Sequence, residues 1–600
     1  MYRYTTTKKA FARYHAYNPK YFPLVFLKIV FERISPYFNL WMSAEIVTAL
    51  YEGRERNTLY FLVAVTLFGN FFVQAAGAVL RRISETAREV LDNNEAAAFY
   101  RKTLSLDYNK MENPQIHLLR RKIQENSFIN SYGVVFMRNL LEMLFSSAID
   151  IVFSAVLFVE MISFLAAVPF RWFGVFLILL MAGFVVANTI LQAKNGGKSA
   201  VYWDQISAVM LEENRISQGY MMAGMDNRIY RQQLIVNRVY EKSNKAHLQV
   251  FSKVRTKVFS LSLPNMVLFK LSELCSYLVI CFYCVIGAFP VGSLIKYVGY
   301  LGKITGGVST ISYALNSLKT NEQFLETYLE YFAVANDMYQ GSLAVEKRSD
   351  KQFEVDFCNV GFRYAGMQDA ALKNINLKLK VGERLAVVGQ NGSGKTTFIK
   401  LLCRLYDPTE GEIFMNDFNI RKYDYRQYLD LFSVVFQDYN LLALPLGNNV
   451  ASAPEWDKEK AKRLLCEVGF GERYETMPAG LDTPLYKEFD EEGVNVSGGE
   501  AQKIALARAL YKDAPFIILD EPTAALDPIA EAEIYAKFDE IVGDKTAIYI
   551  SHRLSSCRFC DKIAVFDGGR IVQVGTHEEL LRDTKGKYYE LWQAQAQYYA

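Results

Sequence analysis

Residues 384–406 read "RLAVVGQNGSGKTTFIKLLCRLY". An apolar run of strand length leads into a glycine-rich turn, and a stretch with helical periodicity follows. The turn fits the pattern G-x-x-x-x-G-K-[ST] between a strand and a helix, where backbone N–H groups and the helix N-terminus bind phosphates. The segment therefore predicts an α/β domain with a nucleotide site at this turn.

The turn supplies the first set of candidate site residues. Lys395 is expected to contact the β- and γ-phosphates of ATP, and the Thr396 hydroxyl is expected to ligate Mg²⁺. The complete set expected to bind ATP here is Gly389, Gln390, Asn391, Gly392, Ser393, Gly394, Lys395, Thr396 and Thr397.

Two further strands end in residues that suit phosphate hydrolysis. "PFIILDEPT" (515–523) places Asp520 where it can hold the metal and Glu521 where it can act as general base on water. "KTAIYISHRLSS" (545–556) ends in His552, a candidate γ-phosphate sensor. The alternatives without a catalytic role are that Asp520 and Glu521 are an accidental acidic pair and that His552 is a hydrogen-bonded core residue. The positions at strand ends argue against both alternatives.

A glutamine and a tyrosine complete the expected nucleotide site. Gln437 follows the strand-like "SVVF" (433–436), where its amide can reach both Mg²⁺ and water. Tyr364, in "VGFRYAG", lies about thirty residues before Lys395 and offers a ring for stacking on adenine.

A second glycine turn, "NVSGGE" (495–500), has no lysine. It leads into the helical "AQKIALARALYK", so the Ser497 hydroxyl and the N–H groups of Gly498 and Gly499 form an anion site at a helix N-terminus. Since the chain's own phosphates already have a loop, this spare site is best used on the ATP of another subunit. The turn therefore predicts two nucleotides held between two such domains.

The first half of the chain differs in composition from this domain. It contains apolar runs long enough to cross a bilayer as helices, and six candidate spans lie near 22–50, 58–80, 133–158, 165–190, 260–288 and 292–316. Lys and Arg concentrate in 1–21, 81–131 and 191–257, while the short opposite loops contain only Arg54 and Arg56. Both chain ends are therefore expected in the cytoplasm, and the basic, aromatic start reads as an amphipathic helix on the inner membrane surface.

Ionisable residues inside the expected spans are candidates for function. Lys270 and Glu273 lie one helical turn apart and can pair with each other. Asp150 has no local partner in the sequence, which makes it a candidate for contact with a cargo in a cavity.

Charge and cysteine content exclude other classes. The net charge of +3 favours neither a nucleic-acid binder nor an acidic tail. The eight cysteines form no disulfide framework, and "CRFC" (557–560) lacks a second ligand pair for zinc. Free thiols in a reducing cytosol are the expected state.

Taken together, the motifs resemble those of the ABC transporter superfamily. The order is aromatic loop, Walker A, glutamine loop, signature, Walker B, "AALD" (524–527) and histidine loop, strongest over about 350–595. With six spans ahead of these motifs, the chain resembles an exporter-type half-transporter. The expected fold is a bundle of six transmembrane helices followed by an α/β P-loop NTPase domain.

The resemblance implies roles for particular residues. Glu521 would be the catalytic base, His552 would contact the γ-phosphate, and Asp527 would communicate across a dimer. The tips near Tyr108 and Tyr220 would be coupling helices, the second docking on the partner's nucleotide domain near "EFDEEG" (488–493). The signature residues on the partner's ATP would be Val496, Ser497, Gly498, Gly499 and Glu500.

Two signature positions depart from the usual pattern. Val496 stands where leucine is commonest, which is a mild change, and Glu500 stands where glutamine is commonest. A carboxylate beside the partner's phosphate would slow closure or hydrolysis at that site. Glu521 and His552 are both present, so the chain's own hydrolytic set looks complete.

The expected domains are an amphipathic segment (1–20), a transmembrane domain (21–330), a linker (331–351) and a nucleotide-binding domain (352–595). The expected function is ATP- and Mg²⁺-dependent transport, with export favoured, across the plasma membrane. The partners would be a second half-transporter, identical or related, the lipid bilayer and an unidentified amphipathic solute, peptide, lipid or drug, with no nucleic acid. Alternatives are a metal-chelate importer with the exporter fold, an ATP-gated channel or regulatory protein, and a soluble ATPase, which the apolar spans disfavour.

Overall fold

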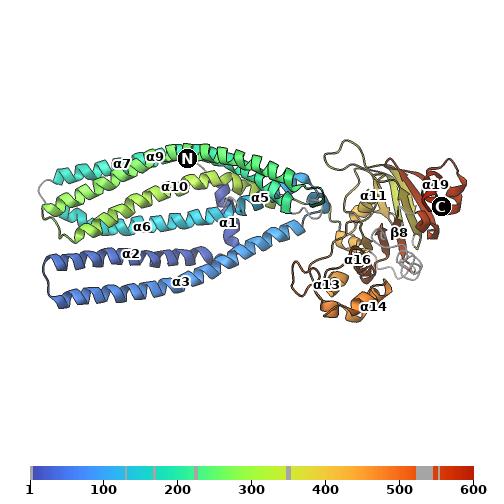
Figure 1. Ribbon diagram of the computed structural model, residues 1–600, viewed down its shortest axis with the longest axis horizontal. Coiled ribbons are helices and arrows are strands. Elements are labelled where there is room, and N and C mark those ends of the chain that lie inside the picture. The colour runs from blue at the N-terminus through green and yellow to red at the C-terminus, as the bar shows by residue number, and fades with distance from the viewer. Residues whose placement is uncertain are drawn as a thin grey trace. The chain divides into compact units, whose positions relative to one another are not determined.

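The computed structural model describes residues 4–128, 132–166, 171–221, 228–345, 353–380, 382–521, 543, 545–551 and 554–599. Contacts divide the chain into two compact units (Figure 1). The first unit comprises Met1–Leu106 and Pro114–Ala335, and the second comprises Asp107–Asn113 and Asn336–Ala600. The nucleotide-binding motifs thus share a unit with a seven-residue piece from the first half of the chain.

The first unit is helical. Its described helices are α1 (Thr5–Tyr17), α2 (Tyr21–Tyr51), α3 (Arg56–Leu104), α5 (Pro114–Phe128), α6 (Val134–Ala166), α7 (Arg171–Met221), α9 (Gln233–Val285) and α10 (Ser293–Ala333). The expected spans 22–50 and 58–80 fall within α2 and α3, and the other four overlap α6, α7, α9 and α10. The span 165–190 begins before α7, with 167–170 outside the described residues, and the span 260–288 extends beyond the end of α9 at Val285.

Several of these helices continue far beyond their apolar segments. In α3 the sequence becomes polar after residue 80, yet Ser84, Ala87 and Leu91 remain buried. Their spacing of three and four residues forms one apolar stripe on an otherwise charged helix. Phe99 extends this buried face toward the end of the helix at Leu104.

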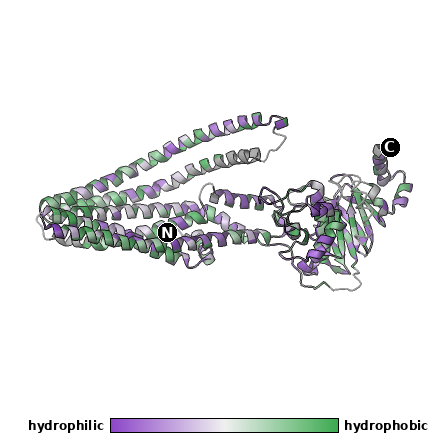
Figure 2. Cartoon of the chain, turned by 60° about the horizontal axis from the view of Figure 1, so that its bottom comes forward, coloured by the Kyte–Doolittle hydropathy of each residue, from purple (hydrophilic) through white to green (hydrophobic). Residues whose placement is uncertain are grey.

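The long helices pack in pairs: α7 with α9, α6 with α10, and α2 with α3. Figure 2 shows hydrophobic residues concentrated toward the end of the bundle where these helices are joined by short loops, while polar residues become frequent along the extensions. Among the described residues, two apolar cores lie in this unit, one around Tyr14, Leu91 and Tyr328 and the other around Tyr283 and Tyr297.

Within the described residues, four helices are long and apolar enough to cross a membrane: α3, the 134–157 part of α6, the 172–196 part of α7, and α9. The helices α2 and α10 fall below this hydropathy. The first carries Lys28, Glu32 and Arg33, and the second carries Lys303 and several glycines, and all of these line one cavity. The lower hydropathy thus has a local cause in polar lining residues.

The amino-terminal helix α1 packs on α3, α6 and α10. Ala10 and Tyr14 are completely buried, and the Tyr14 hydroxyl donates to Asp92 Oδ1 at 2.8 Å. One face of the expected amphipathic helix is therefore covered by protein, and its position on the membrane surface stays a prediction.

The described residues of the second unit form two sheets. Its strands are β1 (Val355–Phe362), β2 (Leu372–Leu379), β3 (Arg384–Gly389), β4 (Glu410–Met415), β5 (Phe418–Asn419), β6 (Phe432–Val435), β7 (Phe516–Asp520), β8 (Thr546–Ile550), β9 (Lys562–Asp567) and β10 (Arg570–Gly575). The antiparallel sheet has the order β2-β1-β4-β5, and the larger sheet has the order β10-β9-β3-β8-β7-β6. All neighbours in the larger sheet are parallel except β10 and β9.

The described helices of this unit are α4 (Tyr108–Met111), α11 (Lys395–Leu402), α12 (Tyr425–Asp430), α13 (Leu446–Ala451), α14 (Lys458–Glu467), α15 (Gly471–Glu475), α16 (Gly498–Lys512), α18 (His577–Arg582) and α19 (Lys587–Tyr599), with short 3-10 turns at 420–422, 480–482 and 554–559. The strands β7 and β8 are buried at every position, as expected for strands covered on both faces. Because β3, β8, β7 and β6 are parallel neighbours, their carboxyl ends meet at one edge of the sheet, where such folds bind ligands.

Candidate nucleotide site

The glycine-rich loop joins β3 to α11 at this edge. Gly389 has φ +152° and Gly394 has φ +104°, which residues with a side chain rarely adopt. A Cβ at Gly389 would overlap the carbonyl oxygen of Phe566. The loop can therefore take this path only with glycine at both positions.

Lys395 begins α11 and folds back over the loop. Its Nζ donates to the carbonyl oxygens of Gly389 at 2.9 Å and Gln390 at 3.0 Å, and the residue is 6% exposed. Burial lowers the pKa of this ammonium, while the carboxylates of Glu521 and Asp520 act to raise it. The positive charge therefore lies close to the two acidic residues that end β7.

The loop also holds a polar atom that fits a phosphate. The Ser393 hydroxyl is buried, with the residue 4% exposed, and its Oγ has no hydrogen-bond partner among the described residues. Buried hydroxyls normally have partners, so this donor inside the loop fits an added acceptor such as a phosphate oxygen.

The two acidic residues of β7 contact different partners. Asp520 is 2% exposed and accepts from the Thr396 hydroxyl through Oδ2 at 3.1 Å. Burial raises the pKa of Asp520 to about 6. A hydroxyl and a carboxylate this close form an oxygen donor set of the kind that Mg²⁺ prefers, so the residues fit the expected metal.

Glu521 lies directly beyond the strand with φ +51°, an uncommon conformation for a residue other than glycine. Its N–H donates to the carbonyl of Ile550 on β8 at 3.0 Å, and its Oε2 accepts from Gln437 Nε2 at 3.0 Å. The strained backbone and these bonds hold the carboxylate beside the glutamine that follows β6. Strain of this kind is concentrated at functional sites.

Tyr364 follows strand β1 of the antiparallel sheet and lies near the glycine-rich loop. Its hydroxyl is 3.0 Å from Thr397 Oγ1, and its ring packs edge-on against Phe362 and Tyr406. The structure thus brings the tyrosine to the nucleotide loop, and stacking on adenine stays a prediction.

The second glycine turn ends at the start of α16. Ser497 caps the helix: its Oγ accepts from the N–H of Glu500 at 3.3 Å, and Glu500 Oε2 accepts from the N–H of Ser497 at 2.7 Å. This capping box leaves the N–H groups of Gly498 and Gly499 pointing out of the helix N-terminus. Val496, just before the cap, packs on the apolar core beneath α16.

The Glu500 carboxylate has a second partner that the sequence did not indicate. Glu500 Oε1 lies 3.0 Å from Nε of Arg473, and Arg473 Nη2 donates to the carbonyl of Asn495 at 3.3 Å. The expected negative charge at the signature is therefore paired with a guanidinium from α15. No sequence signal connects two residues 27 positions apart in this way.

The tip at residues 107–113 packs on the nucleotide-binding unit to which it belongs. Tyr108 packs edge-on against Tyr406 with centroids 5.6 Å apart, and Glu112 accepts from Lys400 Nζ at 3.1 Å and from the Tyr406 hydroxyl. Lys400 and Tyr406 lie on and just after the helix that starts at the nucleotide loop. The tip thus contacts elements that follow directly from the phosphate-binding loop.

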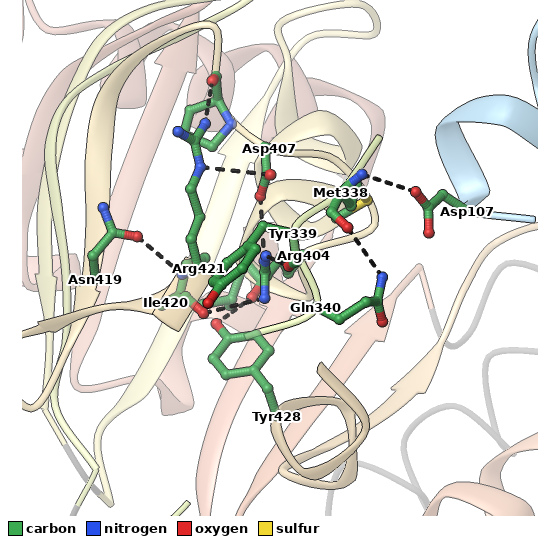
Figure 3. Close-up of polar contacts among 12 residues, drawn as sticks. Asp107, Met338, Tyr339, Gln340, Arg404, Asp407, Asn419, Ile420, Arg421 and Tyr428 are labelled. Carbon is green, nitrogen blue, oxygen red and sulfur yellow. Dashed lines mark hydrogen bonds and ion pairs between the residues drawn. The ribbon is translucent and has the colours of Figure 1, made fainter. Parts of the chain in front are cut away.

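The segment after α10 is fixed beside this tip (Figure 3). Asp107 Oδ2 accepts from the N–H of Met338 at 3.0 Å, and Arg404 donates to the carbonyls of Tyr339 and, at 3.3 Å, Ile420. Arg404 is 0% exposed, has φ +52° and pairs with Asp407 at 3.3 Å. Its signal in the sequence is a single charged residue inside the apolar run "LLCRLY" (401–406).

Some expected residues fall elsewhere. His552 and Asp527 lie outside the described residues, as does most of the second tip, while Tyr220 lies near the end of α7 and its side chain is not among those described. In the first unit, Lys270 and Glu273 pair at 2.7 Å as expected. Asp150, for which the sequence offers no local partner, lies 3.5 Å from Arg33 of α2, because helix packing joins residues far apart in the chain.

Comparisons with known proteins agree with this geometry. Residues 372–524 match the family model described as "ABC transporter". The chain is 28% identical over 598 residues to the subtilin transport ATP-binding protein SpaT of Bacillus subtilis, covering 94% of this chain and 92% of that protein. It is 39% identical over 261 residues to the ATP-dependent lipid A-core flippase of Escherichia coli (strain K12), a match that spans 43% of each protein.

The fold has a counterpart among solved structures. A bacterial Atm1-family ABC exporter with ATP bound superposes with a TM-score of 0.70 over 95% of this chain and 97% of that chain, at 20% sequence identity. The likeness covers the helical unit as well as the nucleotide-binding unit. Residues 372–524 therefore belong to the ABC transporter family, and in this chain they are joined to a helical unit in an arrangement similar to that of an exporter-type half-transporter.

Proposed function

We propose that two such chains, or this chain and a related one, form a transporter in which ATP binds between the two nucleotide-binding domains. The six long helices α2, α3, α6, α7, α9 and α10 would cross the plasma membrane, with both termini in the cytoplasm. The relatives are named for subtilin and lipid A-core, both of which are amphipathic molecules. We infer an amphipathic cargo, moved outward.

One observation carries the proposal: three sets of residues meet at the carboxyl edge of the parallel sheet. They are the buried Lys395 on its loop, the Thr396–Asp520 pair, and the Gln437–Glu521 pair. A cation, a metal donor set and a carboxylate base are the parts that phosphoryl transfer to water requires. The capped N-terminus of α16 is a separate anion site, suited to the ATP of the partner.

Each residue has a distinct part in this scheme. Lys395 would exchange its two carbonyl acceptors for phosphate oxygens, and Asp520 with Thr396 would hold Mg²⁺, which neutralises developing charge on the phosphates when bound. Glu521, held by Gln437, would take the proton of the attacking water. Ser497 uses its oxygen as an acceptor for the cap, so its O–H remains a donor for the partner's γ-phosphate.

Closure of the two domains would follow from differential binding. ATP contacts two domains only when they are closed, so it favours the closed pair by those extra contacts. The tip at 107–113, bound to Lys400 and Tyr406, would transmit that movement to the helices that it joins. Hydrolysis removes the γ-phosphate contact, and the pair reopens.

The test is Glu521→Gln in the full-length protein in nanodiscs. We expect ATP hydrolysis to fall by at least about 10²-fold, because the base is lost while the shape of the site is kept. ATP binding is expected to persist and to trap a closed dimer, measurable by cross-linking between the two domains. Glu467→Gln, on the surface helix α14, is the matched control and should hydrolyse ATP like the wild type.

Two outcomes would contradict the proposal. Unchanged hydrolysis in Glu521→Gln would remove the assignment of the base, and full activity of a demonstrably monomeric chain would remove the shared site. The direction of transport is tested separately with inside-out vesicles, where an exporter accumulates cargo in an ATP-dependent way.

A further inference from the structure

The helical unit contains a cavity of about 770 Å³ between α2, α6 and α10. Six charged residues line it, and they are Lys28, Glu32, Arg33, Glu142, Asp150 and Lys303. Gly302 and Gly306 of α10 also face it, and a Cβ at either position would meet no atom within 4 Å. The volume lies in the range of small-molecule sites, so the cavity has room for a ligand group.

Each of the three carboxylates has a partner in the protein. Glu32 pairs with Arg81 at 3.0 Å, and Asp150 lies 3.5 Å from Arg33 and accepts from the Tyr37 hydroxyl at 3.3 Å. Glu142 accepts from the hydroxyl of Tyr21. The acidic side chains are therefore engaged by groups of the same unit.

The two lysines differ from these carboxylates. Among the residues that the structure describes, neither Lys28 nor Lys303 has an ion-pair or hydrogen-bond partner, although both line the cavity. The lining contains three cations and three carboxylates, and Arg81 from outside the lining neutralises Glu32. One positive charge in the cavity is thus uncompensated.

Unpaired charge in a membrane cavity is costly and marks ligand or ion pathways. An ammonium group has three donors and no acceptor, so its natural partner is an oxyanion. Met143 and Ile29 add apolar surface to the same lining, which suits an acyl chain or apolar side chain next to the anion.

We propose that this cavity binds the oxyanion group of an amphipathic cargo, a phosphate or a carboxylate, between Lys28 and Lys303. The proposal deepens the proposed function and rests on it, because it names the class of molecule that the transporter carries. Arg33 also lines the cavity, but we do not assign it to the ligand, because Asp150 and the Ser146 hydroxyl already bind its guanidinium.

The test measures binding to the full-length protein in phosphatidylcholine nanodiscs without ATP, with binding to empty nanodiscs subtracted. The radiolabelled probes share one chain length: decyl phosphate, N-decanoylglycine, decyltrimethylammonium and decyl maltoside. We expect at least one of the two anions to bind about 10-fold or more tightly than the cation and the maltoside. Comparison of the two anions distinguishes a phosphate-type from a carboxylate-type cargo.

Variants show whether the lysines are responsible. The double variant Lys28→Met with Lys303→Met should bind the preferred anion at least about 10-fold more weakly, and Lys28→Arg with Lys303→Arg should retain binding within about 3-fold. Lys270→Met removes a lysine of the same unit that is exposed and paired with Glu273, and it should bind the anion like the wild type.

The inference is overturned if the cation or the maltoside binds as tightly as both anions, or if the double Met variant binds the anion like the wild type. An equal loss in Lys270→Met would also overturn it, because the effect would then be one of general surface charge. Failure of the proposed function is scored separately by ATP hydrolysis in the wild type and in Glu521→Gln. A protein that hydrolyses ATP but binds no anion would refute only the cavity inference.

Discussion

Arg404 in the nucleotide-binding unit is a buried charge, the cavity lysines Lys28 and Lys303 of the helical unit are half-buried charges, and the surroundings of the two kinds differ. Arg404 is completely buried, and its guanidinium contacts Asp407 and the carbonyls of Tyr339 and Ile420. Lys28 and Lys303 lie in a cavity and have no such partners among the described residues. The charge of Arg404 is compensated by groups of its own unit, whereas the charges of the two lysines are available to a ligand.

The difference follows from the energetics of burial. A buried charge is tolerated when hydrogen bonds and an opposite charge replace its water, and it then fixes the segments that supply them. Arg404 fixes the segment that follows α10 beside the end of α11 (Figure 3). A charge without partners fixes no segment of the fold and remains available to an external ligand.

The largest effect is expected from Arg404→Met. Removing the buried guanidinium takes this donor from the carbonyls of Tyr339 and Ile420 and leaves Asp407 with the more exposed Arg421, at a cost of about 3–5 kcal/mol in the free energy of unfolding of this unit. Unfolding of the full-length protein measures it, and the transition of the nucleotide-binding unit is identified by its shift when ATP is added.

Arg421→Met is the matched control, because Arg421 Nε also lies near Asp407, at 3.5 Å, while its side chain is 41% exposed. Its cost should stay below about 1 kcal/mol, as for other exposed ion pairs. Equal losses in the two variants would mean that burial does not distinguish these arginines.

The sequence predicted the nucleotide site because its chemistry is local. The glycine loop, Lys395, Thr396 and the Asp520–Glu521 pair each lie at the end of a recognisable strand, and parallel pairing brings these ends together. The helical segments were predicted for a similar reason, since an apolar run of about 20 residues is read directly from the chain. The full length of the helices could not be predicted in this way. For example, α10 continues to Ala333 because other helices bury residues such as Leu325 and Tyr331 near its end.

Partnership between distant residues could not be predicted in this way. The sequence offered no partner for Asp150, and the structure supplies Arg33, 117 positions earlier. It suggested an unbalanced charge at Glu500, and the structure supplies Arg473. Whether a charged residue is structural or available depends on such tertiary contacts, so Lys28 and Lys303 could not be distinguished from Arg33 by sequence.

Glu500 is an intermediate case, because its charge is paired but lies at the anion site that we propose for the ATP of the partner. Since Arg473 already neutralises it, we expect Glu500→Gln to change ATP hydrolysis by less than about 3-fold. Arg473→Met should lower ATP hydrolysis by about 3- to 10-fold relative to the wild type, because the Glu500 carboxylate is then unpaired beside the partner's phosphate. The size follows from the strength of a partly exposed ion pair, which is up to about 1 kcal/mol. Steady-state hydrolysis by the purified dimer measures both.

The double variant Arg473→Met with Glu500→Gln is the decisive control. If the arginine acts through the carboxylate, removal of the charge should restore most of the lost activity, and the two effects will not add. An additive loss would show that Arg473 supports the signature through its bond to the carbonyl of Asn495 instead.

The smallest effect on stability is expected in the membrane cavity. Lys28→Met and Lys303→Met remove no ion pair or hydrogen bond within the described part of the protein, so each should change the free energy of unfolding by less than about 0.5 kcal/mol. Arg33→Met is the contrast, because it leaves the buried Asp150 carboxylate without its cation and should cost about 1–3 kcal/mol. Thermal unfolding in nanodiscs ranks the three variants, and lysine variants as unstable as Arg33→Met would show that these lysines serve the fold, leaving no available charge for an anion.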